Sequence, residues 1–437
     1  MLTPTVFLVI AIVVGFYMAW NIGANDVANA FGTSVGSGAL TLGRALLLAG
    51  ICEFGGAFFV GANVADTIKG DIIPAESFTD PGQFGVGMLA ALLAASIWLN
   101  VATFFAQPVS TTHAIIGAVI GFAVVAVGPG HVNWSSMGAI AASWVISPLV
   151  GGSLAYVIYR LIKRLILSNR HPVYRAKAAV PLAFASVICI VVLSMLSVGP
   201  EKLSASAFVP LLPPGMREWL KTLSPALGKV VVALPLAILL AAASALIARW
   251  LIRRSTRNRR VRLAQRYLVV ERWFAQVQIV SACYMAFAHG ANDVANAIGP
   301  LAVAIQVFSG KGAVAAKAAV PLWLLAFGGI GIVVGLATYG YKVLESVGKR
   351  ITEITPTRGF SAEFGTASTV LVCSLLGLPI STTFVLVGAV MGVGIARGFA
   401  AIDLRVIKRI FASWVITIPI SAVLSAILYW ILIALWR

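Results

Sequence analysis

Two aspartates lie inside apolar stretches of this 437-residue chain, each within the same eight-residue segment. Gly23-Ala-Asn-Asp-Val-Ala-Asn-Ala30 recurs without change as Gly290-Ala-Asn-Asp-Val-Ala-Asn-Ala297. A carboxylate at membrane depth is costly unless it is paired, protonated or wetted, and a helix break at these glycines and asparagines would free carbonyls beside it. Such oxygens suit a hard cation, although a plain polar contact between helices is the competing interpretation. The predicted cation ligands are Asn25, Asp26, Asn29, Asn292, Asp293 and Asn296.

A second repeated segment has the composition of an anion site. Ser110-Thr111-Thr112 and Ser381-Thr382-Thr383 each follow a proline, Pro108 or Pro379, by two residues. A serine after such a break can cap a new helix, whose free N–H groups and positive dipole end attract anions. Packing between membrane helices is the alternative. An oxyanion held here beside carboxylates requires cations between them, or protonated aspartates, so anion and Na⁺ or H⁺ would move together.

Two glutamates and two histidines also lie in apolar surroundings. Glu53 and Glu363 both precede Phe-Gly, and we interpret them as an additional cation or proton site rather than as structural ion pairs. His113 and His289 lie beside the repeated segments, where Phe384 and Ile22 occupy the equivalent positions. Because neither histidine is repeated, we interpret both as hydrogen-bonded packing residues rather than as proton carriers.

Composition indicates the elements that must hold these groups. The chain is 60% hydrophobic and 11% charged, with a mean hydropathy of +0.98, against about 25% charged residues in soluble domains. Apolar runs long enough to cross a bilayer recur throughout, and none alternates as a membrane β-strand would. We therefore predict an all-α polytopic membrane protein with about twelve transmembrane helices, some broken or re-entrant. The net charge of +18 lies in short loops, which fits cytosolic loops and argues against a nucleic-acid partner.

The repeated segments divide the chain. Ala142-Ser-Trp-Val-Ile146 recurs as Ala412-Ser-Trp-Val-Ile416, a third match in the same order and at nearly the same spacing. The sequence thus predicts a first repeat at 1–160, a second repeat at 273–437, and two linking helices with a basic loop at 161–272.

Loop charges indicate how the two repeats are oriented. The loop at 128–133 has no lysine or arginine, while its counterpart at 396–409 has Arg397, Arg405, Lys408 and Arg409. Basic residues also crowd 160–177 and 249–272. Cytosolic loops carry such excess, so equivalent loops face opposite sides and both termini lie outside the cell. Inverted-topology repeats are typical of secondary transporters, and no P-loop pattern suggests an ATP-driven pump.

The doubled Gly-Ala-Asn-Asp-Val-Ala-Asn-Ala and Pro-x-Ser-Thr-Thr segments resemble the inorganic phosphate transporter (PiT) family, over nearly the whole chain. The resemblance implies a homodimer in the plasma membrane that takes up phosphate with Na⁺ or H⁺. It implies that Asp26, Asp293 and the two Ser-Thr-Thr segments line the phosphate and cation sites, and that Asn29 and Asn296 help to hold Na⁺. Glu53 and Glu363 match acids important for transport in that family. The short link between the repeats looks prokaryotic.

The leading hypothesis is therefore a sodium/phosphate symporter that is not an enzyme and has no cofactor beyond its coupling ion. A proton-coupled carrier of phosphate or metal–phosphate, and a sulfate permease, are alternatives on the same scaffold. A channel would not be concentrative. A membrane phosphatase would need a base beside its aspartate, and none is evident in the sequence.

Overall fold

The computed structural model describes residues 3–105, 107, 109–200, 203–256, 265–310, 320–341, 355–398 and 404–437. It is 88% helix, and no strand occurs within these residues. The all-α prediction is confirmed.

Eight of the described helices are long and apolar enough to cross a membrane, which makes the chain a multi-pass membrane protein. They are α1 (Pro4–Gly36), α2 (Leu42–Val60), α4 (Pro81–Phe104), α6 (Trp134–Ile162), α7 (Pro172–Val198), α9 (Pro225–Thr256), α11 (Leu322–Gly335) together with its π-helical extension to Gly340, and α15 (Leu404–Trp436). The remaining helices are α3 (Ala62–Gly70), α5 (Thr111–Val127), α8 (Pro214–Lys221), α10 (Arg266–Phe308), α13 (Pro356–Leu375) and α14 (Thr382–Arg397). Because α5 and α14 are short, and α10 and α13 are less apolar, the expected count of twelve spans is not established.

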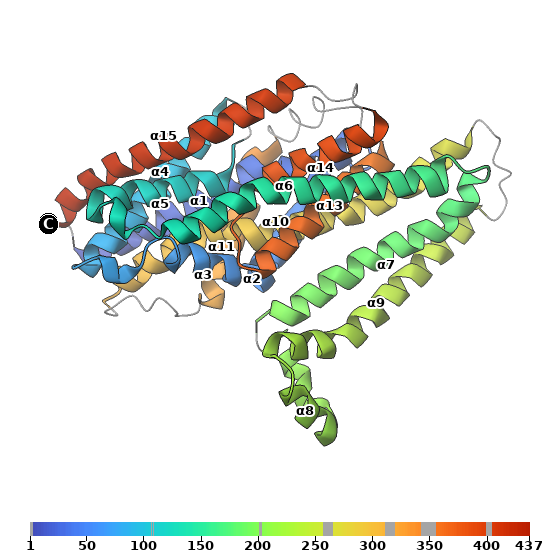
Figure 1. Cartoon of the computed structure of the whole chain (residues 1–437), viewed down its shortest axis with the longest axis horizontal. Coiled ribbons are helices and arrows are strands. Elements are labelled where there is room, and N and C mark those ends of the chain that lie inside the picture. Colours follow the sequence, from blue (N-terminus) through green and yellow to red (C-terminus); the bar gives the residue numbers. More distant parts are fainter. Residues whose placement is uncertain are drawn as a thin grey trace.

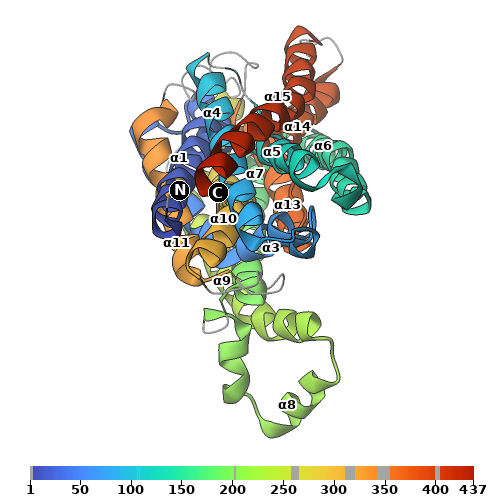
Figure 2. The same cartoon turned by 90° about the vertical axis from the view of Figure 1, so that its left-hand side faces the viewer.

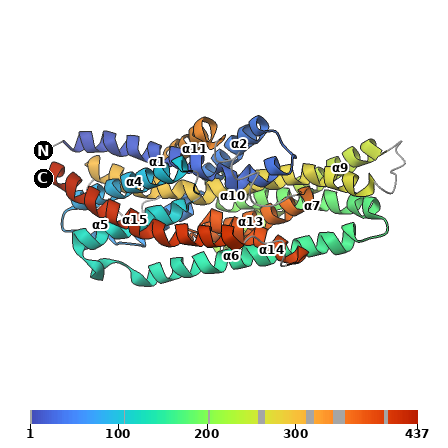
Figure 3. The ribbon, with the colours of Figure 1, turned by 90° about the horizontal axis from the view of Figure 1, so that it is seen from above.

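The helices form an elongated bundle with α1 and α10 near its centre (Figures 1 and 3). A pair formed by α7 and α9 projects from the bundle, with α8 at its far tip (Figure 1). Both chain ends lie at one end of the bundle, and the turn from α6 into α7 lies at the other (Figure 3). Figure 2, viewed toward the chain ends, shows α6 and α15 on the outside of the bundle. These two helices run in opposite directions, since α6 leaves the end where α15 finishes (Figure 3).

The Asn-Asp segments lie within unbroken helices, so the expected helix break at Asp26 and Asp293 is wrong. α1 is helical from Pro4 to Gly36, and α10 from Arg266 to Phe308. The glycines that open the segments serve close packing instead. A Cβ on Gly23 would collide with the backbone carbonyl of Ile332 in α11, and one on Gly290 with that of Glu53 in α2. Small residues permit such approach between membrane helices.

The breaks lie instead between α4 and α5 and between α13 and α14. Ser110 caps α5 by accepting a hydrogen bond from the His113 N–H at 3.1 Å, and Ser381 caps α14 by accepting one from the Phe384 N–H at 3.4 Å. The prediction that these serines begin new helices is confirmed. Of the two prolines, Pro379 precedes α14 as expected, while Pro108 lies outside the described residues.

Part of the charge evidence also falls outside the described residues. This applies to Arg257, Arg259, Arg260 and Arg262 of the link, and to the side chains of Arg405, Lys408 and Arg409. The described turn after α6 carries Lys163 and Arg164.

Candidate functional site

The starts of α5 and α14 meet the Asn-Asp segments of α1 and α10. The Asn29 amide in α1 donates to the Thr383 hydroxyl of α14 at 2.8 Å, and the Asn296 amide in α10 donates to the Thr112 hydroxyl of α5 at 3.2 Å. Each Asn-Asp segment therefore contacts the Ser-Thr-Thr segment that lies in the other part of the sequence. The four segments that sequence analysis singled out form one buried site.

Two further contacts tie the Ser-Thr-Thr segments to this centre. The Thr382 hydroxyl donates to Asp293 Oδ2 at 2.9 Å. The Thr112 hydroxyl donates to the carbonyl of Ile380, just before the other cap, at 2.9 Å. Two helix N-termini thus open beside two carboxylates, an arrangement that supplies N–H and O–H donors to an anion.

The outer asparagines hold the chain breaks in place. The Asn25 amide donates to the Val109 carbonyl at 3.1 Å, and its Oδ1 accepts from the Thr103 hydroxyl at 3.2 Å. The Asn292 amide donates to the Leu378 carbonyl at 3.2 Å and to the Ser374 hydroxyl at 3.0 Å. Both asparagines therefore position the loops before α5 and α14, whatever else they bind.

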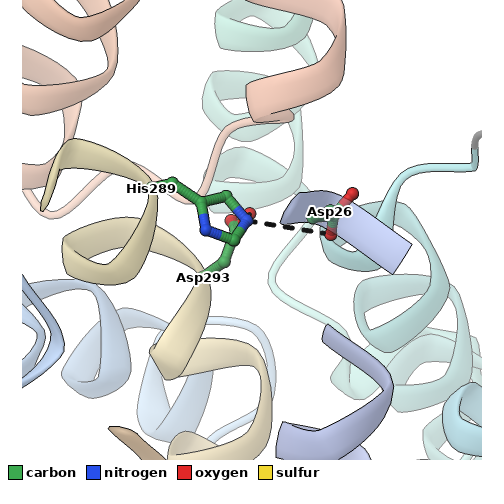
Figure 4. Close-up of side chains that lie close together, drawn as sticks. All are labelled: Asp26, His289 and Asp293. Atoms are coloured by element: carbon green, nitrogen blue, oxygen red, sulfur yellow. Dashed lines mark ion pairs between the residues drawn. The ribbon is translucent and has the colours of Figure 1, made fainter. Parts of the chain in front are cut away.

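His289 lies among three buried carboxylates. Its Nε2 is 2.9 Å from Asp293 Oδ2 and 3.9 Å from Asp26 Oδ2, and its Nδ1 is 3.3 Å from Glu53 Oε1. Figure 4 shows the imidazole of His289 beside Asp293, with Asp26 facing it from α1. A single imidazole cannot neutralise three carboxylates, so the centre requires either further positive charge or protonated carboxyl groups.

Several oxygens around this centre lack partners. Asp26 Oδ2, both carboxylate oxygens of Glu53, and the amide oxygens of Asn292 and Asn296 are buried without a hydrogen bond. Buried polar atoms without partners are costly and rare. Asp26, His289 and Asp293 each offer one ligand atom, all within 4.8 Å of one another. An oxygen-rich set of this kind fits a hard cation.

Glu363 lies in a second polar cluster, on α13. Its carboxylate accepts hydrogen bonds from the hydroxyls of Thr33, Ser34 and Ser281, and from the Gln278 amide at 3.2 Å. The Ser34 contact is 2.8 Å long. Thr33 lies two turns beyond Asp26 on α1, about 10 Å along the helix axis. The structure therefore separates the two predicted glutamates: Glu53 belongs with the aspartates, and Glu363 does not.

Sequence reasoning missed several members of these clusters. His289 was expected to be a packing residue, yet its position four residues before Asp293 puts both on one helix face, a signal the sequence contained. The other omitted residues are Thr33, Ser34, Thr103, Gln278, Ser281 and Ser374. His113 does pack among side chains as expected, but neither ring nitrogen has a hydrogen-bond partner, contrary to expectation.

The chain matches the model of the phosphate transporter family over residues 22–425. It is 42% identical over 426 residues to a protein of Pyrococcus furiosus named as a phosphate permease, an alignment covering 97% of this chain and 95% of the relative. It is 43% identical to the chloroplastic inorganic phosphate transporter 2-1 of Arabidopsis thaliana, over 95% of this chain and 70% of the relative.

A solved structure described as the sodium-dependent phosphate transporter superposes on the chain with a TM-score of 0.83, at 39% identity, covering 98% of this chain and 99% of the other. The resemblance inferred from the repeated segments is confirmed. The relatives are transporters and permeases rather than enzymes, and the chain belongs to the phosphate transporter family.

Proposed function

We propose that this protein is a symporter that carries inorganic phosphate across the plasma membrane together with Na⁺. The observation that carries the proposal is the meeting of two capped helix starts with buried carboxylates, of which Asp26 Oδ2 and both oxygens of Glu53 make no hydrogen bond. Helix N-termini attract an anion, whereas carboxylates repel it. Cations bound between the carboxylates and the anion would cancel this repulsion.

The phosphate-binding site in this proposal is formed by Ser110, Thr111, Thr112, Ser381, Thr382 and Thr383, with Asp26 and Asp293 beside it. A tetrahedral oxyanion accepts hydrogen bonds on every oxygen, so hydroxyls and N–H groups arriving from two sides suit it. The carboxylates would receive phosphate only with its cations, or when it carries protons to donate.

The proposed cation-binding sites are formed by the carboxylates Asp26, Asp293 and Glu53 and the amide oxygens of the Asn-Asp segments. Support comes from the oxygens that make no hydrogen bond, and from the solved structure described as a sodium-dependent phosphate transporter, which is 39% identical over nearly the whole chain. Loading Na⁺ lowers the negative charge of the centre, and phosphate then binds. Coupling follows, because neither solute is stable in the site alone.

A further cation-binding site in this proposal lies at Glu363. Its carboxylate, on α13, accepts from hydroxyls of α1 and α10 and from the Gln278 amide N–H of α10. Helix α1 carries both Asp26 and the Thr33 and Ser34 hydroxyls beside Glu363, so it connects this cation site to the central one. The two clusters would then respond together to sodium.

The architecture that we propose has about twelve spans, counting α5, α10, α13 and α14, in two inverted-topology repeats assembled as a homodimer. Sequence-equivalent contacts support the repeats, since Asn29–Thr383 and Asn296–Thr112 are reciprocal, and α6 and α15 run in opposite directions. Positive loops place both termini outside the cell.

The test is uptake of labelled phosphate by liposomes holding the purified protein, under an inward Na⁺ gradient, an inward H⁺ gradient or neither. Accumulation with Na⁺ only, unaffected by sulfate, is the expected result. Accumulation with H⁺ alone would assign the proton-coupled alternative, and dependence on Mg²⁺ or Ca²⁺ would assign metal–phosphate. Uptake of labelled sulfate would assign a sulfate permease, and equilibration without accumulation would assign a channel.

A further inference from the structure

A cavity of about 750 Å³ lies between α6 and α14, apart from the buried site. It extends along α6 from Ala141 to Val157, a length of about 24 Å at the rise of an α-helix. Its walls are almost entirely apolar side chains, and Val145, Leu149 and Val157 on its rim are exposed on the outside of the bundle. In a membrane protein, such a rim faces lipid.

The cavity arises because α6 and α14 touch backbone to backbone. A Cβ on Gly392 would collide with the carbonyl of Gly152, and a Cβ on Gly388 with that of Pro148. Glycines at this crossing contribute no side chains, so the space beside it is left unfilled.

The polar side chains that line the cavity are His113 and Trp144 at its inner end and Ser153 and Tyr156 farther along α6. His113 is 3% exposed and lines the cavity, and neither of its ring nitrogens has a hydrogen-bond partner. Its ring packs against Trp144 at 3.9 Å and Phe384 at 4.5 Å, between ring centroids. Charge would be costly in such apolar surroundings, so the ring offers one N–H donor and one acceptor. Pro148 also lacks the N–H that a helix would direct to the Trp144 carbonyl.

We propose that this cavity binds a lipid-soluble alcohol, with its hydroxyl at His113 and its hydrocarbon chain along α6. A hydroxyl both donates and accepts, which matches the free imidazole. The acyl chain of an ordinary phospholipid fills the groove but leaves His113 without a partner. A second copy of the chain would need a polar side chain inserted to the same depth.

Occupancy also bears on transport. The His113 N–H donates to Ser110, the Phe384 N–H donates to Ser381, and the Trp144 indole donates to the Pro379 carbonyl at 3.2 Å. The backbone N–H groups of His113 and Phe384 and the indole of Trp144 therefore contact the segments that start α5 and α14, and the side chains of these residues line the inner end of the cavity. A bound alcohol holds both segments in one arrangement and lowers the maximal rate of phosphate uptake without competing for phosphate. This second statement rests on the proposed function, whereas binding does not.

Binding is tested on the purified full-length protein in liposomes. The probes are a diazirine-bearing dodecanol and the corresponding dodecane, which lacks the hydroxyl. Saturable labelling of α6 and α14 by the alcohol only is the expected result. His113→Phe keeps the aromatic contacts and lowers labelling about fivefold, the factor for one net hydrogen bond. Leu149→Trp fills the cavity and abolishes labelling. Leu161→Trp, an exposed position of α6 outside the cavity, leaves labelling unchanged.

The proposed alcohol site is overturned by equal labelling with the dodecane probe, by no labelling with either probe, or by unaltered labelling of Leu149→Trp. For transport, dodecanol should lower the maximal uptake rate of the unmodified protein and leave Leu149→Trp unaffected. Labelling without any phosphate uptake would contradict the proposed function and not the cavity. Uptake that dodecanol does not change, despite saturable labelling, would overturn the regulatory role alone.

Discussion

At the residue scale, Asp26 and Asp293 differ in how far the protein satisfies them. Asp293 Oδ2 accepts from Thr382 and lies beside His289, whereas Asp26 Oδ2 is buried with no hydrogen bond. The Asn29 amide donates to the other Asp26 oxygen at 3.0 Å. Of the two aspartates, Asp26 is therefore the more dependent on a cation, and substitutions at the two positions should differ in degree.

We expect Asp26→Asn to raise the Na⁺ concentration for half-maximal phosphate uptake at least ~10-fold, about 1.4 kcal/mol of cation binding. Asparagine preserves the shape but removes the charge that attracts Na⁺. Asp293→Asn should raise this concentration less, because Thr382 and His289 already contact that side chain. Sodium titrations of initial uptake rates measure both.

Glu218→Gln is the matched control, since this carboxylate is 72% exposed and pairs only with Lys221 among its described contacts. It should transport as the unmodified protein does. Wild-type accumulation by both aspartate variants, each with an unchanged elution profile, would remove these aspartates from the site.

The second glutamate gives a separate prediction. Glu363→Gln should reduce the steepness with which phosphate uptake depends on Na⁺ concentration, because one proposed cation-binding site is lost. The phosphate concentration for half-maximal uptake at saturating Na⁺ should change little. Sodium titration at fixed phosphate measures the steepness. Ser368→Ala, on the same helix and bonded to Tyr284, is the control. An unaltered sodium curve in Glu363→Gln would make the Thr33–Ser281–Glu363 cluster a structural contact.

The sequence alone identified the repeated polar residues of the site and the glutamates Glu53 and Glu363, but not the other residues that occur once. Asp26, Asp293 and the Ser-Thr-Thr segments were found because the repeat marked them, and the structure brings them together. His289 has Ile22 as its counterpart, so the same reasoning favoured packing. Glu363 and its partners Thr33 and Ser281 come from three helices, and no spacing along the chain places them together.

At the element scale, the glycines that begin the Asn-Asp segments were read as helix breakers, and they prove to be contact points. In an apolar surrounding a helix keeps its own hydrogen bonds, so local propensity for turns is overridden. The breaks before α5 and α14 were predictable, because a proline and a capping serine stand together there. Which helix packs on Gly23 or Gly290 depends on tertiary contacts.

We expect Gly290→Ala to destabilise the protein by about 1–3 kcal/mol, because its Cβ would collide with the backbone of Glu53 and force α2 from α10. Glu53 would move with α2, so phosphate uptake should fall as well. Thermal unfolding in detergent, followed by the loss of monodisperse protein, measures the first effect.

Gly138→Ala provides the comparison within α6. This glycine is exposed and has no atom within 4 Å of an added Cβ, so alanine should be neutral or stabilise the helix by about 0.5–1 kcal/mol. Equal unfolding midpoints for the two variants would mean that α2 and α10 can separate at no cost, against the close contact described above.

At the scale of the whole molecule, orientation follows from charge and direction together. Both chain ends lie at one end of the bundle, while Lys163 and Arg164 follow α6 at the other (Figure 3). Cytosolic loops collect positive charge, so we expect the end with the termini to face outward. If the repeats are inverted, the equivalent helices α5 and α14 must end on opposite sides, although the sequences around them match.

Single cysteines test this directly, in a variant lacking Cys52, Cys189, Cys283 and Cys373. His131, after α5, and Arg397, at the end of α14, are both exposed. A membrane-impermeant maleimide added to intact cells should label His131→Cys but not Arg397→Cys until the membrane is opened. Thr3→Cys and Ser168→Cys are the references for the outer and inner faces. Labelling of His131→Cys and Arg397→Cys from the same side would contradict inverted repeats, and with them a single midplane site reached alternately from both faces.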